Sequence, residues 1–337
     1  MKQYGMAVIG LGVVGRRMLE QAGRHRGFRV VAAFDSASAA RSEAAASFPG
    51  LPVVARARDA IERLDVDVVY VAVPPLAHAE YVRAAHAAGK AVFCEKPLGI
   101  DLAEGAALVE LASGGAGAGD VVAGGAVAGG VAPRSRHAVN FVFASSAAVE
   151  ALRKVVTTRA FGLRAVEIQM RFFEWPRAWQ AGATWLRRAD QGGFTREVLS
   201  HYVYLLLRVF GDATLLGACT QRPSAGAAET ASVATLRCAG VPVAMQGSVG
   251  GQPPDVVEAR FVGASRELRL RNWYELVEHV AEAPGGRPVA GLPEDPRGAS
   301  YQAQLTQLHA MVAGKAHGLP DFETAWRVQQ IIEEILT

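Results

Sequence analysis

The chain has 337 residues and a net charge of +3; half of its residues are hydrophobic and a fifth are charged. This length favours two globular domains, and the absence of a basic block argues against nucleic acid as a partner. No apolar run approaches the ~20 residues that a membrane helix needs. The N-terminus opens on a strand pattern rather than a signal peptide, so we expect a cytoplasmic protein with no membrane partner.

The first elements in chain order predict a dinucleotide-binding turn. An apolar strand over 6–9 runs into Gly10-Leu11-Gly12-Val13-Val14-Gly15, and an amphipathic helix over 16–24 follows. In such a unit the first glycine permits the tight turn, the second lets the backbone approach a pyrophosphate, and the third lets helix and strand pack closely. The helix N-terminus offers N–H groups and a positive dipole end to the phosphates.

The next strand, predicted over 28–34, ends in an acid that bears on the choice of cofactor. Asp35 follows this strand directly, where a carboxylate can accept hydrogen bonds from the hydroxyls of an adenine ribose. A carboxylate repels a 2′-phosphate, so Asp35 favours NAD over NADP. Ser36 and Arg41 lie close enough in sequence to accommodate that phosphate, so NADP stays open.

The alternation of strands and helices continues to residue 94 and predicts a Rossmann-type, doubly wound parallel sheet of the α/β class. We expect strands over 53–54, 67–73 and 91–94 and helices over 59–64 and 78–88. Ligands of such sheets bind outside the carboxyl ends of the strands. The residues that fall at those ends are Gly10, Asp35, Pro74 and Lys96, so the Glu95-Lys96-Pro97 turn is a candidate site and not only a solvated loop.

Four segments together resemble the Gfo/Idh/MocA family of nicotinamide-dependent oxidoreductases. They read AVIGLGVVG, VDVVYVAVPPLAHAEYVRAAHAAGKAVFCEKPL, AVNFVF and GGFTREVLSH. The resemblance implies an enzyme, an NAD(P)-dependent dehydrogenase or reductase. It would transfer a hydride between nicotinamide and a C–OH/C=O carbon of a sugar, cyclitol or related small molecule.

The resemblance also implies roles for the residues around the EKP turn. Lys96 would lie beside the nicotinamide and pass a proton to or from the substrate, while Glu95 would hold the cofactor or the lysine. His78 matches a family histidine that we expect to pack against the cofactor cleft. The full expected cofactor-binding set is Gly10, Gly12, Val13, Val14, Gly15, Asp35, Ser36, Arg41, Val73, Pro74, His78, Glu95 and Lys96.

A second family element pairs an acid with a histidine four residues later, here Glu197 and His201. Spacing of four puts two side chains on one face of an α-helix, and both are predicted to be catalytic. The family usually has Asp at the position of Glu197 and often an acid at the position of Tyr204, so His201 either exchanges a proton or only orients substrate. A core histidine is the structural alternative. No third ligand is evident, so we expect no metal.

The segment over 113–136 is rich in Gly and Ala and predicts a flexible insertion before the last strand of the sheet, over 138–143. A helix over 147–156 and a largely β region then predict an α+β domain with an open, mostly antiparallel sheet. The expected strands are 163–172, 215–220, 232–238, 243–249, 256–262 and 267–271, and the closing helices are 302–313 and 322–336. We expect domains over 1–145 and 146–337, with the C-terminal helix able to pack back on the first.

Partners follow from the same resemblance, which implies a homodimer or homotetramer formed through the C-terminal sheet. The substrate is expected to meet the segment over 171–186, which holds three of the five tryptophans, although these can equally be core anchors. The predicted substrate residues are Arg171, Glu174, Trp175, Trp185 and Arg196. Cys94, Cys219 and Cys238 lie in apolar surroundings and are expected to be buried thiols.

Two other functions stay open. Phe141-Val142-Phe143 stands where sugar-acting members often have a polar group, which suggests a less polar cleft and an imine or carbonyl reductase of biosynthesis. The replacements at Glu197 and Tyr204 also leave room for a non-catalytic NAD(H) sensor.

Overall fold

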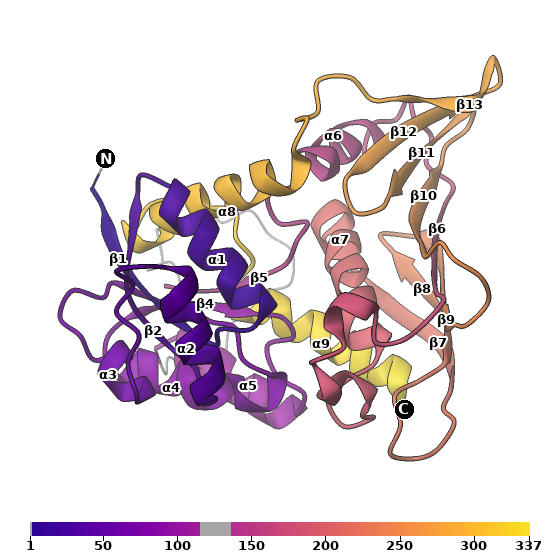
Figure 1. The fold of residues 1–337 in the computed structure, drawn as a ribbon. Coiled ribbons are helices and arrows are strands. Elements are labelled where there is room, and N and C mark those ends of the chain that lie inside the picture. Colours follow the sequence, from indigo (N-terminus) through magenta and orange to yellow (C-terminus); the bar gives the residue numbers. More distant parts are fainter. Residues whose placement is uncertain (1, 115–135) are drawn as a thin grey trace. The chain divides into compact units, whose positions relative to one another are not determined.

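The structure, a computed structural model, describes residues 2–114 and 136–337, so most of the predicted insertion over 113–136 lies outside the described residues (Figure 1). The chain divides into two compact units. The first comprises Met1–Ala144 and Tyr301–Trp326, and the second comprises Ser145–Ser300 and Arg327–Thr337. Residues 301–326, which were expected in the second domain, group with the first unit.

The first unit contains a five-stranded parallel sheet in the order β2-β1-β3-β4-β5, which confirms the predicted Rossmann-type fold. Its strands are β1 (Tyr4–Ile9), β2 (Phe28–Phe34), β3 (Val68–Val71), β4 (Ala91–Glu95) and β5 (His137–Asn140). Every residue of β1, β3 and β5 is buried, as a sheet covered on both faces requires. Val53 makes only a single bridge to Ala33, so the strand predicted over 53–54 does not form.

Helices around this sheet complete the first unit. They are α1 (Val13–Arg24), α2 (Ser38–Ser47), α3 (Ala57–Ile61), α4 (His78–Ala87) and α5 (Leu102–Ala112), with a 3₁₀ turn, η1 (Pro75–Ala77), before α4. The later helix α8 (Pro296–Val312) sends Leu305, Leu308 and Met311 into the same hydrophobic core as β1 and β3. This burial of apolar surface explains why the chain returns to the first unit near its end.

The last strand of this sheet is shorter than predicted. β5 ends at Asn140 rather than 143, because the chain turns there: the Phe141 N–H donates to the Val139 carbonyl, and the Ala144 N–H donates to the Phe141 carbonyl. Phe141 and Phe143 are both buried. Their apolar character is therefore explained by packing and says nothing about the polarity of a substrate site.

The second unit contains an eight-stranded sheet in the order β13-β12-β11-β10-β6-β9-β8-β7. Its strands are β6 (Ala165–Phe172), β7 (Thr214–Gln221), β8 (Ala231–Cys238), β9 (Val241–Val249), β10 (Val256–Val262), β11 (Arg266–Arg271), β12 (Glu275–Val280) and β13 (Ala283–Pro288). All neighbours are antiparallel except β6 and β9, which confirms the predicted mostly antiparallel sheet. Strands β12 and β13 were not predicted from the sequence. At the opposite edge, β7 leaves Cys219 exposed, so the expectation of three buried thiols was wrong for this residue.

The helices of the second unit include α6 (Ala147–Val156), as predicted, and α7 (Ser200–Phe210), which is almost entirely buried. Two 3₁₀ turns, η2 (Ala178–Gln180) and η3 (Thr184–Arg187), precede a π-helical segment, η4 (Thr195–Leu199). The last helix, α9 (Phe322–Leu336), begins in the first unit and ends in the second.

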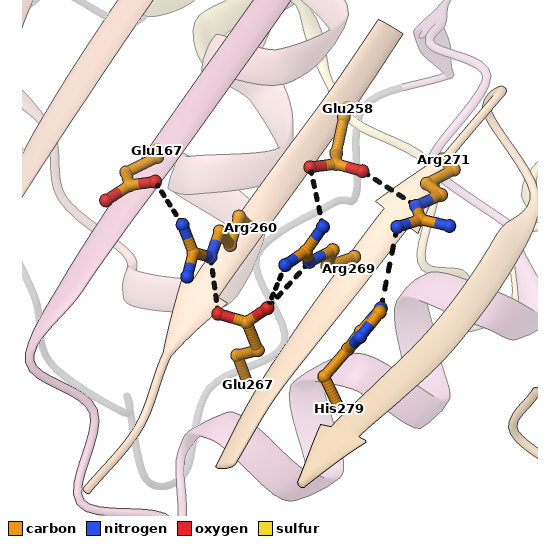
Figure 2. Close-up of polar contacts among 7 residues, drawn as sticks. All are labelled: Glu167, Glu258, Arg260, Glu267, Arg269, Arg271 and His279. Carbon is orange, nitrogen blue, oxygen red and sulfur yellow. Dashed lines mark hydrogen bonds and ion pairs between the residues drawn. The ribbon is translucent and has the colours of Figure 1, made fainter. Parts of the chain in front are cut away.

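The outward-facing side chains of β6, β10, β11 and β12 form a network of paired charges (Figure 2). Arg260 Nη1 lies 3.2 Å from Glu167 Oε2, and Arg271 Nε donates to Glu258 Oε2 at 2.7 Å. Glu267 accepts from Arg260 and Arg269. Although burial raises the pKa of Glu267, the hydrogen bonds from these two arginines leave it below its usual value. Each charge is therefore matched by a neighbour on the sheet.

Candidate functional site

The three glycines between β1 and α1 have different physical roles. Gly10 has φ +98°, and a Cβ there would lie 2.3 Å from the Ala72 carbonyl oxygen at the end of β3. A Cβ on Gly15 would lie 1.8 Å from the Gly10 carbonyl oxygen. Packing within the protein therefore demands glycine at both positions. A Cβ on Gly12 would meet nothing within 4 Å. Packing within the protein therefore does not require glycine at this position, whereas a ligand that approaches the backbone closely would.

The N-terminus of α1 faces the same turn. Gly12 is its N-cap, and no side chain caps it. Val13, the first helical residue, is half-exposed. The first turn of a helix carries N–H groups with no partner inside the helix, so this end is suited to an anionic group.

Asp35 ties the end of β2 to this turn. One carboxylate oxygen accepts the Leu11 N–H at 2.7 Å and the other accepts the Ala37 N–H at 2.8 Å. Arg41 Nη1 donates to the carbonyl oxygens of Asp35 and Ser36, at 2.7 and 3.0 Å. A carboxylate oxygen accepts more than one hydrogen bond, so Asp35 keeps acceptor capacity for a ligand while the two backbone donors hold it in place.

Lys96 follows β4 directly and is buried, and its peptide bond to Pro97 is cis. The preceding Glu95 is anchored to the neighbouring strands. Its Oε1 accepts from Asn140 Nδ2 of β5 at 2.6 Å and from the Tyr70 hydroxyl of β3. Burial, with the Glu95 charge, raises the pKa of Tyr70 well above its usual value, so its hydroxyl remains a donor. Glu95 is thus held in the sheet rather than projecting freely to a ligand.

Neither Tyr70 nor Asn140 was among the site residues predicted from the sequence. Asn140 was detectable, because it is a polar residue at the carboxyl end of a parallel strand and is the register partner of Glu95. Tyr70 lies inside an apolar strand, and only the pairing of β3 with β4 brings its hydroxyl to Glu95.

His78, at the start of α4, is almost completely buried. Its Nδ1 lies 2.8 Å from the Pro97 carbonyl oxygen and its Nε2 lies 2.9 Å from the Val73 carbonyl oxygen. Both ring nitrogens are therefore directed at backbone carbonyls, and the expected packing of His78 against the cofactor cleft stays a prediction. Burial lowers the pKa of His78 to about 4, so the ring is neutral at pH 7 and donates to one of the two carbonyls.

In the second unit, a buried carboxylate caps the segment that carries Glu197. Glu229 Oε1 accepts the Thr195 N–H at 2.6 Å. A Cβ on Gly193 would lie 2.0 Å from Glu229 Oε2, and Gly193 has φ +94°. The glycine is therefore required by the carboxylate as well as by its backbone conformation. Glu229 was missed, because its contact joins two segments far apart in sequence.

Glu197 lies in the π-helical turn rather than on a regular α-helix, so the predicted α-helical spacing to His201 does not apply. Its Oε1 accepts from Gln180 Nε2 at 3.0 Å, and Gln180 Oε1 accepts in turn from Arg177 Nε at 2.8 Å. π-Helical turns occur frequently at functional sites. His201, in the first turn of α7, is buried, and its ring meets that of Trp273 edge-on at 5.4 Å.

Three of the predicted substrate residues use their polar groups inside the second unit. Arg196 binds both carboxylate oxygens of Glu333 and also donates to the Ala189 and Gly192 carbonyls. Arg171 donates to the Gln252 and Pro254 carbonyls, and Trp175 Nε1 donates to the Leu186 carbonyl at 3.1 Å. These three polar groups therefore have partners within the protein, and the substrate contacts of Arg171, Trp175 and Arg196 stay predictions. Glu174 is exposed and Trp185 is half-buried.

Two absences hold for residues 2–114 and 136–337. There, no group of three or more His, Cys, Asp or Glu side chains is arranged to hold a metal ion. Across the same residues, none of the helices combines the length and apolar character that a membrane crossing needs.

Residues 4–116 match the family model described as "Oxidoreductase family, NAD-binding Rossmann fold", GFO_IDH_MocA. This segment belongs to the Gfo/Idh/MocA oxidoreductase family. The match confirms the predicted family and the NAD-binding character of the first unit. It covers the glycine turn, Asp35, His78 and Lys96.

Relatives of this Gfo/Idh/MocA segment include the inositol 2-dehydrogenase of Gluconacetobacter diazotrophicus, 42% identical over 102 residues, which are 30% of this chain and 30% of the relative. The inositol 2-dehydrogenase of Rhodococcus erythropolis is 39% identical over 106 residues, 31% of each chain. The matched segments thus span about a third of these relatives' length.

A solved structure shares the fold over the whole chain. It is a levoglucosan dehydrogenase in complex with NADH and L-sorbose, with a TM-score of 0.81 and 16% identity, covering 100% of this chain and 96% of that one. At this identity the likeness establishes the fold, including the second unit that the family model does not reach.

Proposed function

We propose that this protein is an NAD-dependent oxidoreductase that transfers a hydride between nicotinamide and a C–OH/C=O carbon of a sugar, cyclitol or related molecule. The observation that carries the proposal is the order of the sheet. Asp35, the glycine turn and Lys96 follow β2, β1 and β4, and the chain reverses its direction of winding between β1 and β3. Ligands of doubly wound sheets bind at that reversal, outside the carboxyl ends.

The residues of the first unit fit a dinucleotide. The open space over Gly12 and the uncapped end of α1 suit a pyrophosphate, and the Asp35 carboxylate suits a pair of ribose hydroxyls. The nicotinamide of the bound cofactor would supply or accept the hydride.

In this proposal Lys96 transfers the proton that accompanies the hydride. In the oxidation direction its Nζ accepts the proton of the substrate hydroxyl, and in reduction it returns a proton to the carbonyl oxygen. General acid–base catalysis of this kind contributes roughly 10²–10⁴-fold to the rate. His201 shares in proton handling or orients the substrate oxygen.

Glu197 is proposed to act with His201, and its support is the chain of contacts from Arg177 through Gln180. Gln180 uses its amide oxygen toward Arg177, which directs its amide N–H toward Glu197. The carboxylate is thereby held in one orientation by a buried residue. A fixed carboxylate is what substrate positioning needs.

NAD is the proposed cofactor because Asp35 is locked by two backbone N–H groups and cannot easily withdraw from a 2′-phosphate. Arg41, the nearest candidate to bind such a phosphate, donates instead to two carbonyl oxygens.

The first test is a fluorescence titration of the protein with NADH and, separately, NADPH. Tighter binding of NADH than of NADPH supports the proposal. If the folded protein binds neither cofactor, the proposal that it is an enzyme is refuted, and protein partners would be sought instead. A panel of myo-inositol, other polyols, sugars and cyclic imines follows with the bound cofactor. Activity on imines alone would replace the polyol proposal with a biosynthetic reductase, and binding without turnover would favour an NAD(H) sensor.

The Lys96→Met variant tests the proposed proton relay. It should retain NADH binding and lose at least about 100-fold in kcat. Turnover within a few-fold of the unsubstituted protein would exclude Lys96 from proton transfer.

We also propose self-association through the outer face of the eight-stranded sheet. Its β7 and β8 strands expose Leu216 and Val233, which are 54% and 52% accessible. Strands β6, β10 and β11 of the same sheet, beyond β9, carry charges that are already paired (Figure 2). Light scattering should show a dimer or tetramer that Val233→Lys dissociates; a monomer at micromolar concentration would refute this contact.

A further inference from the structure

One buried side chain joins the two loops that frame the Lys96 position. β3 and β4 pair in parallel register as far as Val71 and Cys94. Extending that register by two residues places Val73 opposite Lys96, beyond the last backbone pairing. His78 lies across this gap: its Nε2 is 2.9 Å from the Val73 carbonyl oxygen, and its Nδ1 is 2.8 Å from the Pro97 carbonyl oxygen. The neutral ring donates its one N–H to one of these carbonyls and packs against the other.

The backbone by itself offers little to hold these loops together. Residues 74, 75 and 97 are prolines, which have no N–H to donate across the gap. The carbonyls of Val73 and Pro97 therefore lie where the hydrogen-bond ladder between β3 and β4 would continue, but fewer backbone N–H groups are available there to donate to them. The imidazole of His78, 1% exposed, occupies that place.

We propose that His78 is a positioning residue that sets the location of Lys96 by linking the loop after β3 to the loop after β4. The proposal rests on the proposed role of Lys96 as proton relay. It differs from a cofactor contact, because the ring nitrogens face the backbone on both sides. It also differs from plain core filling, because Leu would fill much of the same space without the hydrogen bond that the ring N–H donates to one of the two carbonyls.

The chain offers a matched control in His137. This histidine is also buried in the first unit, and burial also lowers its pKa to about 4. It stands at the first residue of β5, at the amino end of the sheet, opposite to the end where Lys96 lies. A general loss of stability should affect His78→Leu and His137→Leu alike, whereas a loss of positioning should affect only the first.

The direct readout is chemical labelling of Lys96 by an amine-reactive reagent, followed by mass spectrometry, with the exposed Lys154 of the second unit as reference. This measurement needs no substrate. We expect His78→Leu to raise the Lys96 labelling rate at least about fivefold relative to Lys154, because a side chain released from a packed position gains solvent access. His137→Leu should leave that ratio unchanged. His78→Gln, whose amide carries two donors, should bring the Lys96 labelling rate most of the way back to that of the unsubstituted protein.

The kinetic readout uses the substrate found in the panel. His78→Leu should lower kcat by about 10–100-fold, because displacing a reacting group by an ångström costs this much. The Kd for NADH should change by less than about threefold, since the glycine turn and Asp35 are untouched. His78→Gln should recover most of kcat.

Wild-type labelling and kcat in His78→Leu would overturn the proposal, as would equal effects of His78→Leu and His137→Leu. If His78→Leu fails to fold, the comparison of His78→Gln with His78→Asn, whose shorter amide reaches at most one carbonyl, decides by the same labelling ratio. If labelling shifts as expected but the protein neither binds NADH nor turns over any substrate, the positioning of Lys96 stands and the proposed function fails.

Discussion

The contact between Arg196 and Glu333 permits a sharp test of whether Arg196 is a structural or a substrate residue. Arg196 Nε and Nη2 each donate to one carboxylate oxygen of Glu333, at 2.7 and 2.6 Å. The two side chains are only 9% and 15% exposed. The perturbation is Glu333→Ala, which removes the carboxylate and leaves the guanidinium with only the carbonyls of Ala189 and Gly192.

The expected magnitude follows from that burial. Removing one partner of a buried ion pair costs about 3–5 kcal/mol, because the remaining charge is left uncompensated. Arg196 keeps two carbonyl acceptors and some solvent access, so we expect a loss at the lower end of this range, about 3 kcal/mol. Replacing both residues, as Arg196→Met with Glu333→Leu, should cost less than Glu333→Ala alone.

The assay is unfolding in urea followed by tryptophan fluorescence. Four of the five tryptophans, Trp175, Trp179, Trp185 and Trp273, lie in the second unit, which also contains the pair, so the signal reports mainly on that unit. The matched control is Arg188 with Asp190, a pair of the second unit in which Nε and Nη2 also donate to the two carboxylate oxygens but both side chains are exposed. Asp190→Ala should leave the unfolding midpoint unchanged.

The reasoning would be refuted by a loss below about 1 kcal/mol in Glu333→Ala together with a KM raised by tenfold or more. That outcome would mean that the pair contributes little to folding and that Arg196 serves the substrate, as its place in the sequence first suggested. A large loss of stability with an unchanged KM for the remaining folded protein supports the structural role.

Three further predictions concern the first unit. Asp35→Ala should weaken NADH binding by about tenfold or more and reduce the preference for NADH over NADPH. Titration with both cofactors checks this, and an unchanged ratio of the two dissociation constants would show that another residue selects NADH over NADPH. Gly12→Ala should fold normally and lose NADH affinity, whereas Gly15→Ala should lose stability because its Cβ would lie 1.8 Å from a carbonyl oxygen; circular dichroism with titration separates the two, and normal folding of both would contradict the packing argument. The pKa values of His78 and His137 are lowered by burial to about 4, so the unfolded chain binds more protons between pH 6.5 and 4 and stability should fall as pH drops through that window, by up to about 3 kcal/mol for each ring. Urea midpoints at pH 5 and 7.5 in wild type and His137→Leu measure this, and a slope that is no smaller in the variant would show that His137 is not one of the groups responsible.

The local sequence determined the first unit to a large extent. Each βα unit has its own hydrophobic period and its own turn residues, so the order of β1, α1 and β2 and the glycine turn follow from short stretches of chain. The position of Lys96 at a strand end follows in the same way, since a parallel strand bound for the middle of a sheet is apolar until it ends.

Tertiary structure decided the partners of the polar residues. Arg196 and Glu333 are 137 residues apart, and Glu229 reaches Thr195 across 34; no local period encodes such contacts. Tyr70 looked like part of an apolar strand until the register of β3 against β4 brought it to Glu95. Interactions at long sequence separation depend on which surfaces the fold brings together, so an arginine in a promising segment can turn out to be a structural anchor.

The strands and helices at the margins were decided in the same way. β12 and β13 lack a strong alternation, and β13 contains glycines and prolines, so these strands are defined by pairing at the edge of the sheet, β12 with β11 and β13 with β12. The π-helical turn at Glu197 has the composition of an ordinary helix; what distinguishes it is the Glu229 carboxylate at its start and the packing around Gly193. Sequence alone thus determined the class of the fold and the place of the cofactor turn, because these depend on local periodicity and backbone freedom. The roles of the buried charges had to await the structure, because they depend on contacts that only the folded chain creates.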